Sequence, residues 1–152
     1  MASIGESFPL SSRQQFVQDH LKSTCVVKVA VRFPEGTKVK FLAIAYEDDE
    51  DCLAFVINTE VNPFVAKRPH LNQCQVKIDC ATHSFLDHDS YVACHEALAL
   101  NRRDLVDELV AAPSKLKGNV TDAVREQIVS AVKYARTISE AEKSKILSCL
   151  DC

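Results

Sequence analysis

The spacing of apolar residues changes along this chain from a two-residue period to a helical one, and that change limits the folds open to it. Between Cys25 and Ile57 the chain consists of β-branched and alternating segments separated by turn residues. From Asn101 onward the apolar residues recur at helical spacing, most regularly over residues 124–135. A helix is also predicted ahead of the strands. The order helix, strands, helices predicts an α+β fold, with a small antiparallel SH3-like β-barrel or curled sheet and helices packed at one side.

Five strands are predicted: Cys25–Phe33, Lys38–Tyr46, Leu53–Ile57, Gln73–Asp79 and Tyr91–Leu100. The first three form an antiparallel meander, because their connections are too short for parallel crossovers. Leu53–Ile57 is apolar throughout, which indicates a central strand. The alanine content of Tyr91–Leu100 leaves a helix as its alternative. Asn58–Asn72 is predicted to be a long loop, of the kind that tends to be functional.

The sequence is predicted to form a single domain, 1–152. This domain contains an N-terminal helix (10–22), a sheet (25–100) and C-terminal helices (101–149). Ser11 and Gln14 form a predicted capping box, and Phe16, Val17 and Leu21 share the inner face of the first helix. The later helices are predicted to start at three capping residues and to be separated by a proline and a linker. In chain order these positions are Asn101, Pro113, Lys117–Asn119, Thr121 and Ser139, and the last helix runs to about Leu147.

Composition excludes several classes of protein. The 152 residues are 47% hydrophobic and 26% charged with a net charge of −3, so there is no whole-protein attraction to nucleic acid. Local basic patches at Lys67-Arg68, Arg102-Arg103 and the pair Lys115 and Lys117 are the candidates for such contact. No apolar run approaches the ~20 residues of a membrane span, and the start of the chain lacks the features of a secretory signal. The seven irregularly spaced cysteines favour a reduced, cytoplasmic protein.

Three of the five histidines lie in Cys80–His95, between the predicted sheet and helices. His83 or His88, paired with Asp87 or Asp89, has the chemistry of a general acid–base pair that accepts a 2′-hydroxyl proton. The same side chains are also potential ligands for a divalent ion. A third interpretation makes the aspartates acceptors in a turn and the histidines surface groups.

The predicted loop Asn58–Asn72 is the second place with functional side chains. Asn58, Thr59 and Asn62 are short polar groups beside an apolar strand end, which is typical of a recognition rim and equally of turn and cap positions. Lys67 or Arg68 would stabilise charge on a phosphorane.

The peptide SFLDHDSYVACHEALALNRRDLVDELVAAPSKLKGNV, which follows a meander of short strands, resembles the layout of the PemK/MazF plasmid-maintenance toxins. The segments that carry the resemblance are Ser90–Leu100, Asn101–Ala111, Leu116–Gly118 and Val120–Ala135. The resemblance implies an SH3-like barrel and endoribonuclease activity. It also implies an arginine at the start of the second strand, where this chain has Lys38-Val-Lys40, and a threonine or serine ending the third, where it has Thr59.

We therefore expect a toxin-like RNA-cleaving or RNA-binding protein, without metal or cofactor, in which two segments share one rim of the sheet. The predicted catalytic residues are Thr59, Arg68, His83, Asp87 and His88, and the predicted binding residues are Asn58, Asn62, Lys67 and Asp89. The alternative is a non-enzymatic protein-interaction module on the same barrel that lacks the catalytic arginine. Expected partners are RNA or a protein such as an antitoxin, and a homodimer is the expected assembly.

Overall fold

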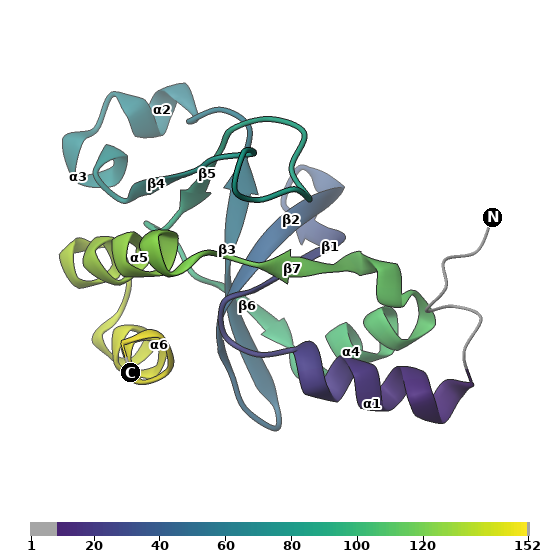
Figure 1. Cartoon of the computed structure of the whole chain (residues 1–152). Coiled ribbons are helices and arrows are strands. Elements are labelled where there is room, and N and C mark those ends of the chain that lie inside the picture. Colours follow the sequence, from purple (N-terminus) through teal and green to yellow (C-terminus); the bar gives the residue numbers. More distant parts are fainter. Residues whose placement is uncertain (1–8, 152) are drawn as a thin grey trace.

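The structure, a computed structural model, describes residues 9–151. The helices are α1 (Leu10–His20), α2 (Pro63–Ala66), α3 (Pro69–Asn72), α4 (Arg102–Ala111), α5 (Asp122–Tyr134) and α6 (Glu140–Leu150). The strands are β1 (Cys25–Phe33), β2 (Gly36–Glu47), β3 (Asp51–Asn58), β4 (Gln75–Ile78), β5 (Ser90–Ala93), β6 (Leu98–Asn101) and β7 (Leu116–Asn119). The predicted α+β class, with a curled antiparallel sheet between an N-terminal helix and C-terminal helices, is confirmed (Figure 1).

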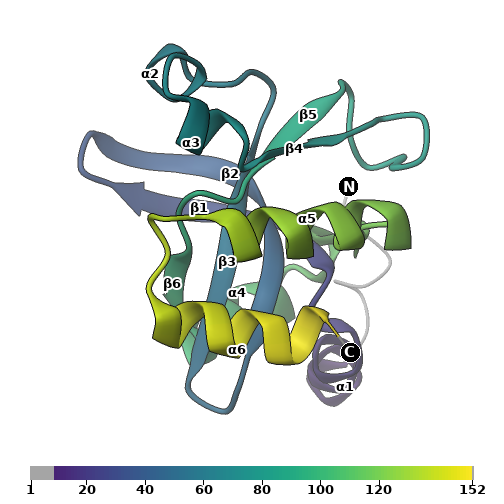
Figure 2. The same cartoon turned by 90° about the vertical axis from the view of Figure 1, so that its left-hand side faces the viewer.

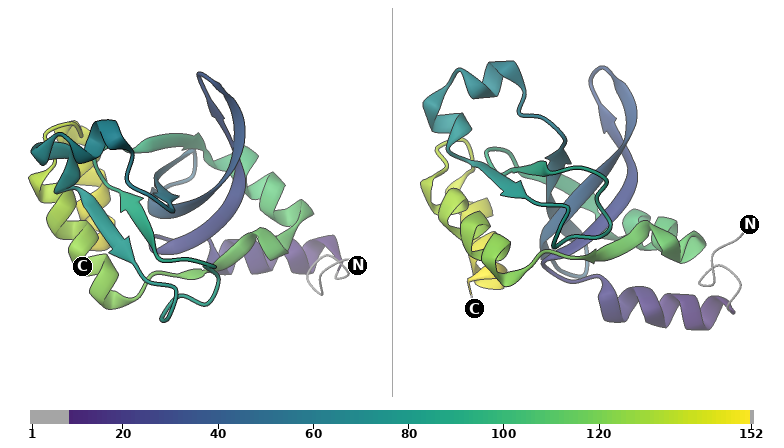
Figure 3. Two further views of the ribbon diagram at one scale, coloured as in Figure 1. Left: turned by 90° about the horizontal axis from the view of Figure 1, so that it is seen from above. Right: turned by 45° about the horizontal axis from the view of Figure 1, so that its top comes forward.

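The predicted meander forms the middle of the sheet. β1 pairs with β2 and β2 with β3, each antiparallel, in the path β4-β5-β3-β2-β1-β7. β3 is central as predicted, because β2 lies on one side of it and both β5 and β6 lie on the other. The sheet curls into a half-barrel (Figure 3).

The predicted fifth strand, Tyr91–Leu100, is wrong as a single element. β5 pairs with the end of β3 and β6 with its beginning, so the chain follows β3 but leaves it between the two. In this break the Cys94 main-chain N–H donates to the Cys74 carbonyl, and the His95 carbonyl accepts from the Thr137 hydroxyl. Contacts with more distant segments therefore interrupt the strand.

Two segments expected to lack regular structure are ordered elements. The loop predicted at Asn58–Asn72 contains α2 and α3, each with a proline in its first turn. The linker predicted at Lys117–Asn119 belongs to β7, which pairs with β1 through Cys25 and Asn119. The region 25–100 therefore contains helices as well as strands, and the region 101–149 contains a strand as well as helices. Strand pairing and helix capping satisfy main-chain hydrogen-bonding groups, and such partners leave no periodic pattern in the sequence.

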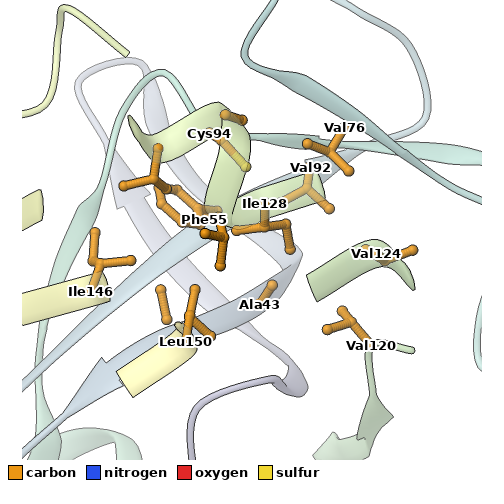
Figure 4. Close-up of a cluster of buried hydrophobic side chains, with 14 of the residues drawn as sticks. Ala43, Phe55, Val76, Val92, Cys94, Val120, Val124, Ile128, Ile146 and Leu150 are labelled. Carbon is orange, nitrogen blue, oxygen red and sulfur yellow. The ribbon is translucent and has the colours of Figure 1, made fainter. Parts of the chain in front are cut away.

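Helices cover both faces of the sheet. α5 and α6 pack on one face and enclose a core, part of which is shown in Figure 4, and α1 and α4 enclose a second core on the other face (Figures 1 and 2). The labelled residues in Figure 4 include Phe55 from the sheet, Ile128 from α5 and Ile146 from α6. The predicted apolar stripe of α5 is buried in full: Val124, Ile128, Ala131, Val132 and Ala135.

The predicted caps are right for three helices and wrong for one. The side chains of Asn101, Thr121 and Ser139 accept the main-chain N–H three residues ahead. The predicted capping box at Ser11 is wrong, because the N-cap is Pro9, two residues before Ser11. In α1, Val17 and Leu21 are buried as predicted, whereas Phe16 is 41% exposed. The last helix continues beyond Leu147, to Leu150.

Candidate functional site

The outer part of the β1–β2 pair projects from the body of the protein as a two-stranded hairpin (Figures 2 and 3). Residues 28–41, called the basic hairpin below, contain four cations and one carboxylate, for a net charge of +3. The cations are Lys28, Arg32, Lys38 and Lys40, and the carboxylate is Glu35. Since the chain has 18 basic and 21 acidic residues, the other residues have 14 and 20 and carry −6. The hairpin is therefore a local positive surface on an acidic protein.

Strand register separates the hairpin cations into two pairs. Lys28 lies opposite Phe41 and Arg32 opposite Thr37, so these two cations share the face of the sheet that also carries the first core. The Lys28 ammonium lies 5.1 Å from the centre of the Phe41 ring, a cation–π contact. Val39, on the same face and opposite Ala30, is 62% exposed.

Lys40 is the hairpin cation that reaches a predicted binding residue. Its Nζ donates to Asn58 Oδ1 at 3.1 Å, because the β2–β3 register places Lys40 beside the end of β3. Thr59 follows Asn58 and is exposed. The structure thus brings one of the two lysines at the implied arginine position to the residue that precedes Thr59.

The other predicted residues of the second segment lie on and around α2. Asn62 caps α2 by accepting the Phe64 main-chain N–H at 2.8 Å. The Arg68 Nη1 donates to the Phe64 carbonyl at 2.8 Å, and its guanidinium carbon lies 3.4 Å from the centre of the Phe64 ring. Lys67 is exposed at the C-terminal end of the helix.

His83, the predicted acid–base residue, is only 1% exposed and bridges two segments. Its Nδ1 lies 2.9 Å from the Asp79 main-chain oxygen, which only accepts, so Nδ1 carries the proton. The Thr121 main-chain N–H donates to Nε2 at 3.1 Å. Both nitrogens of the neutral ring are therefore occupied, and a proton-transfer role would require this network to open.

The carboxylates of the connector between β4 and β5 (79–89) divide into bonded and exposed groups. Asp89 accepts the Cys80 main-chain N–H at 3.0 Å and lies 3.6 Å from Lys77, and the Cys80 hydrogen bonds lower the pKa of Asp89. Asp79 accepts from the Thr82 hydroxyl and main chain, and the hydroxyl bond is the main cause of its lowered pKa. The Asp89 bond is of the kind predicted for a turn acceptor, whereas Asp79 was not among the predicted residues. Asp87 and His88 are exposed.

The two predicted segments meet at one point and then separate. Asn58 pairs with Tyr91, so the end of β3 lies beside the end of the connector. From there the chain continues to α2 and α3, which precede β4, whereas the connector follows β4. Figure 2 shows α3 and the connector at opposite ends of the β4–β5 hairpin. The structure therefore brings Asn58 and Thr59 to the connector but leaves Arg68 away from His83.

The surroundings of Cys94 and Cys80 do not favour a cysteine nucleophile. Burial raises the pKa of the Cys94 thiol well above its usual range, and the hydrogen bond with Asp89 raises the pKa of Cys80. The thiolate that a nucleophile requires is disfavoured at both. Among residues 9–151 no group of three or more His, Cys, Asp or Glu side chains is arranged to hold a metal ion.

The basic hairpin is a feature that motif spacing along the chain does not reveal. Its signal is nevertheless present in the sequence, since Lys28 and Arg32 alternate with apolar residues before the Pro34–Gly36 turn and Lys38 and Lys40 alternate after it. The antiparallel pairing predicted for these two strands already implied four cations on one projection. Consecutive pairs such as Lys67-Arg68 are more conspicuous in the sequence and led the prediction to other segments.

No protein-family model matches the sequence, and no curated protein matches it significantly. None of the helices in residues 9–151 has the length and apolar character to cross a bilayer.

Proposed function

We propose that this chain is a toxin-like RNA-binding protein whose basic hairpin holds the phosphate backbone of single-stranded RNA. The observation that carries the proposal is the charge of +3 on residues 28–41, against −6 on all other residues. A projecting cluster of cations supplies the salt-dependent attraction to phosphates, and the negative remainder limits adhesion elsewhere on the surface.

The face that carries Lys28 and Arg32 suits a single strand better than a duplex. On this face the exposed Val39 lies between the two cations, and Phe41 lies opposite Lys28, under its ammonium. Apolar and aromatic groups between cations bind unpaired bases, whose faces are accessible only in single strands.

Assignment to the PemK/MazF class belongs to the same proposal. It is supported by the curled antiparallel sheet and by the order of the short helix α4 and the longer helix α5, although the strand β7 stands between them where the resemblance has a linker. It is also supported by the bond between Lys40, at the place of the implied arginine, and Asn58, the residue before the implied threonine. For cleavage of a bound strand we favour Lys40 and Thr59 over His83, because both ring nitrogens of His83 are occupied.

The test is binding of a labelled single-stranded RNA to the full chain over a range of salt concentrations. The K28Q/R32Q variant is expected to weaken binding and to reduce the slope of log affinity against log salt by about 1.4, or roughly 0.7 for each phosphate that is no longer neutralised. The matched control R103Q/R136Q removes two exposed cations from α4 and from the segment between α5 and α6. Equal effects of the two variants, or no binding at low salt, would refute the proposal. The RNA recovered afterwards is examined for cleavage.

A non-enzymatic protein-interaction module remains the second candidate, and one observation favours it. An open hollow of about 670 Å³ lies between β4 and α5, lined by side chains that include Gln75, Gln127, Ser130 and Tyr134. β4 is the last strand on its side of the sheet, so an extended partner segment has a strand edge to pair with. Binding of a protein partner that Ser130→Arg abolishes, without RNA binding by the unsubstituted chain, would favour this module.

A further inference from the structure

Phe64 is an exposed aromatic side chain whose position is fixed by the residues around it. Phe64 is 58% exposed and lies in α2, a four-residue helix that is capped by Asn62 and begins at Pro63. Val65, the next residue, is buried and attaches the helix to the body of the protein. The ring is thus presented to solvent from an anchored segment.

Arg68 occupies one side of this ring. Its guanidinium carbon lies 3.4 Å from the ring centre, and its Nη1 is held by the Phe64 carbonyl at 2.8 Å. The guanidinium is therefore held over the ring at two points, and the large exposed fraction of Phe64 leaves aromatic surface available on the solvent side. Lys67 is exposed beside them.

An aromatic ring backed by a guanidinium, with a lysine alongside, has the chemistry that binds a nucleobase and its phosphate. We propose that Phe64 and Arg68 form a stacking platform for one unpaired base of single-stranded RNA, which rests on the RNA-binding function proposed above. A ligand that stacks here does not have to order the side chain, because the Arg68 contact and the helix cap already do so.

The platform is connected to the basic hairpin through the chain itself. Asn58, which accepts a hydrogen bond from Lys40, is six residues before Phe64, a reach of at most about 20 Å. A strand that reaches Lys40, on the other face of the hairpin from Lys28 and Arg32, can therefore place a base on the platform. The segment from residue 60 to 72 has two permanently charged cations, Lys67 and Arg68, and one carboxylate, Glu60. Its net charge is therefore positive, as is that of the hairpin.

The experiment compares two probes of equal length, a single-stranded RNA and an abasic strand with the same phosphates. F64A and F64L are expected to weaken binding of the RNA by about 5- to 150-fold, the range for one stacked base, and to leave the abasic strand unaffected. The salt slope is expected to stay unchanged, because the ring contacts no phosphate. F16A is the matched control, since Phe16 is also exposed and stacks on His20 with ring centres 4.3 Å apart.

A direct readout comes from F64W, because the chain contains no tryptophan. The single indole of this variant is expected to be quenched by the RNA and unchanged by the abasic strand, while F16W is quenched by neither. Retained RNA affinity in F64A and F64L, or equally weakened binding of both probes, overturns the platform and leaves Phe64 as a structural or protein-contacting residue. The proposed function is judged separately, because K28Q/R32Q then still weakens both probes. If the hairpin variant has no effect either, the RNA function fails as well.

Discussion

The Thr121 main-chain N–H donates to His83 Nε2 at 3.1 Å and so joins the connector between β4 and β5 to the first turn of α5. Phe85, two residues on, packs against Gly118 of β7, since a Cβ added at Gly118 would lie 3.1 Å from the Phe85 ring. The connector therefore crosses from β4 to the opposite end of the strand order and spans the open side of the half-barrel. The stretch richest in histidine thus has a clear structural role.

We predict that His83→Ala lowers the free energy of unfolding by about 2 to 4 kcal/mol, because it removes a buried ring and leaves the partly buried Asp79 carbonyl and Thr121 N–H without that partner. Urea unfolding at neutral pH measures the change. His88→Ala, at an exposed position of the same connector, is the control and should change stability by less than about 0.5 kcal/mol. Equal stability of the two variants would contradict the bridging role.

The contact between Phe85 and Gly118 gives a second prediction, for which Gly36 supplies the control. Both glycines have positive φ, +156° at Gly118 and +133° at Gly36, so an alanine at either should cost about 1 to 3 kcal/mol of stability through the backbone alone. Only Gly118 has a neighbour within 4 Å of the added Cβ. Gly118→Ala should therefore be worse than Gly36→Ala by about 1 kcal/mol or more.

A double-mutant cycle isolates that contact. In a Phe85→Leu background the flexible side chain can move away, so the additional cost of Gly118→Ala should shrink toward that of Gly36→Ala. Thermal or urea unfolding of the four proteins in the cycle gives the coupling energy. Additive effects would show that Phe85 does not press on Gly118.

Local patterns were sufficient to predict much of the fold. The α5 stripe is visible in sequence because its period matches one buried face, and the caps at Asn101, Thr121 and Ser139 are visible because each bonds a main-chain N–H only three residues away. The meander of β1, β2 and β3 follows from short connections. Each of these features depends on residues close together in the chain.

The features that sequence reasoning missed depend on distant partners. β7 is a strand because Asn119 pairs with Cys25, and His83 is a buried bridge because Thr121 lies 38 residues away in sequence but 3.1 Å away in space. The basic hairpin is an exception, because the predicted pairing of β1 and β2 already implied that its cations lie on one projection. For the candidate site, sequence indicated that Asn58, Thr59 and Arg68 lie in an unusual segment, but only the register shows which of them reach the hairpin.

Tyr46 and Asp48 give a prediction that needs no ligand. The Tyr46 hydroxyl donates to Asp48 Oδ2 at 2.7 Å, and this bond is the main cause that raises the pKa of Tyr46 to about 12. Asp48→Ala should return the tyrosine pKa toward about 10, its usual value. Tyrosinate absorbance during an alkaline titration measures this, with Tyr46→Phe subtracted to isolate one of the three tyrosines. Superimposable titrations of the parent and Asp48→Ala would contradict the bond.

The half-buried His95 should make stability depend on pH. Burial lowers the pKa of His95, and the Gln75 side-chain amide lies 2.9 Å from its Nδ1 and donates to the unprotonated nitrogen. The unfolded chain, with a histidine pKa of about 6.5, therefore binds the proton more tightly than the folded chain. The free energy of unfolding should fall as pH decreases from about 6.5 through the lower folded pKa, and this contribution should level off below it.

His95→Gln removes the titrating group while keeping an amide that can bond to Gln75, so the variant should lack this part of the pH dependence. Urea unfolding of both proteins between pH values of about 5 and 8 measures the effect, and the difference between the two curves cancels the contributions of the carboxylates. We expect the parent to lose stability relative to His95→Gln as the solution becomes more acidic. A constant difference across the range would show that His95 takes up its proton equally well in the folded chain, and the Gln75 contact would then have no influence on its titration.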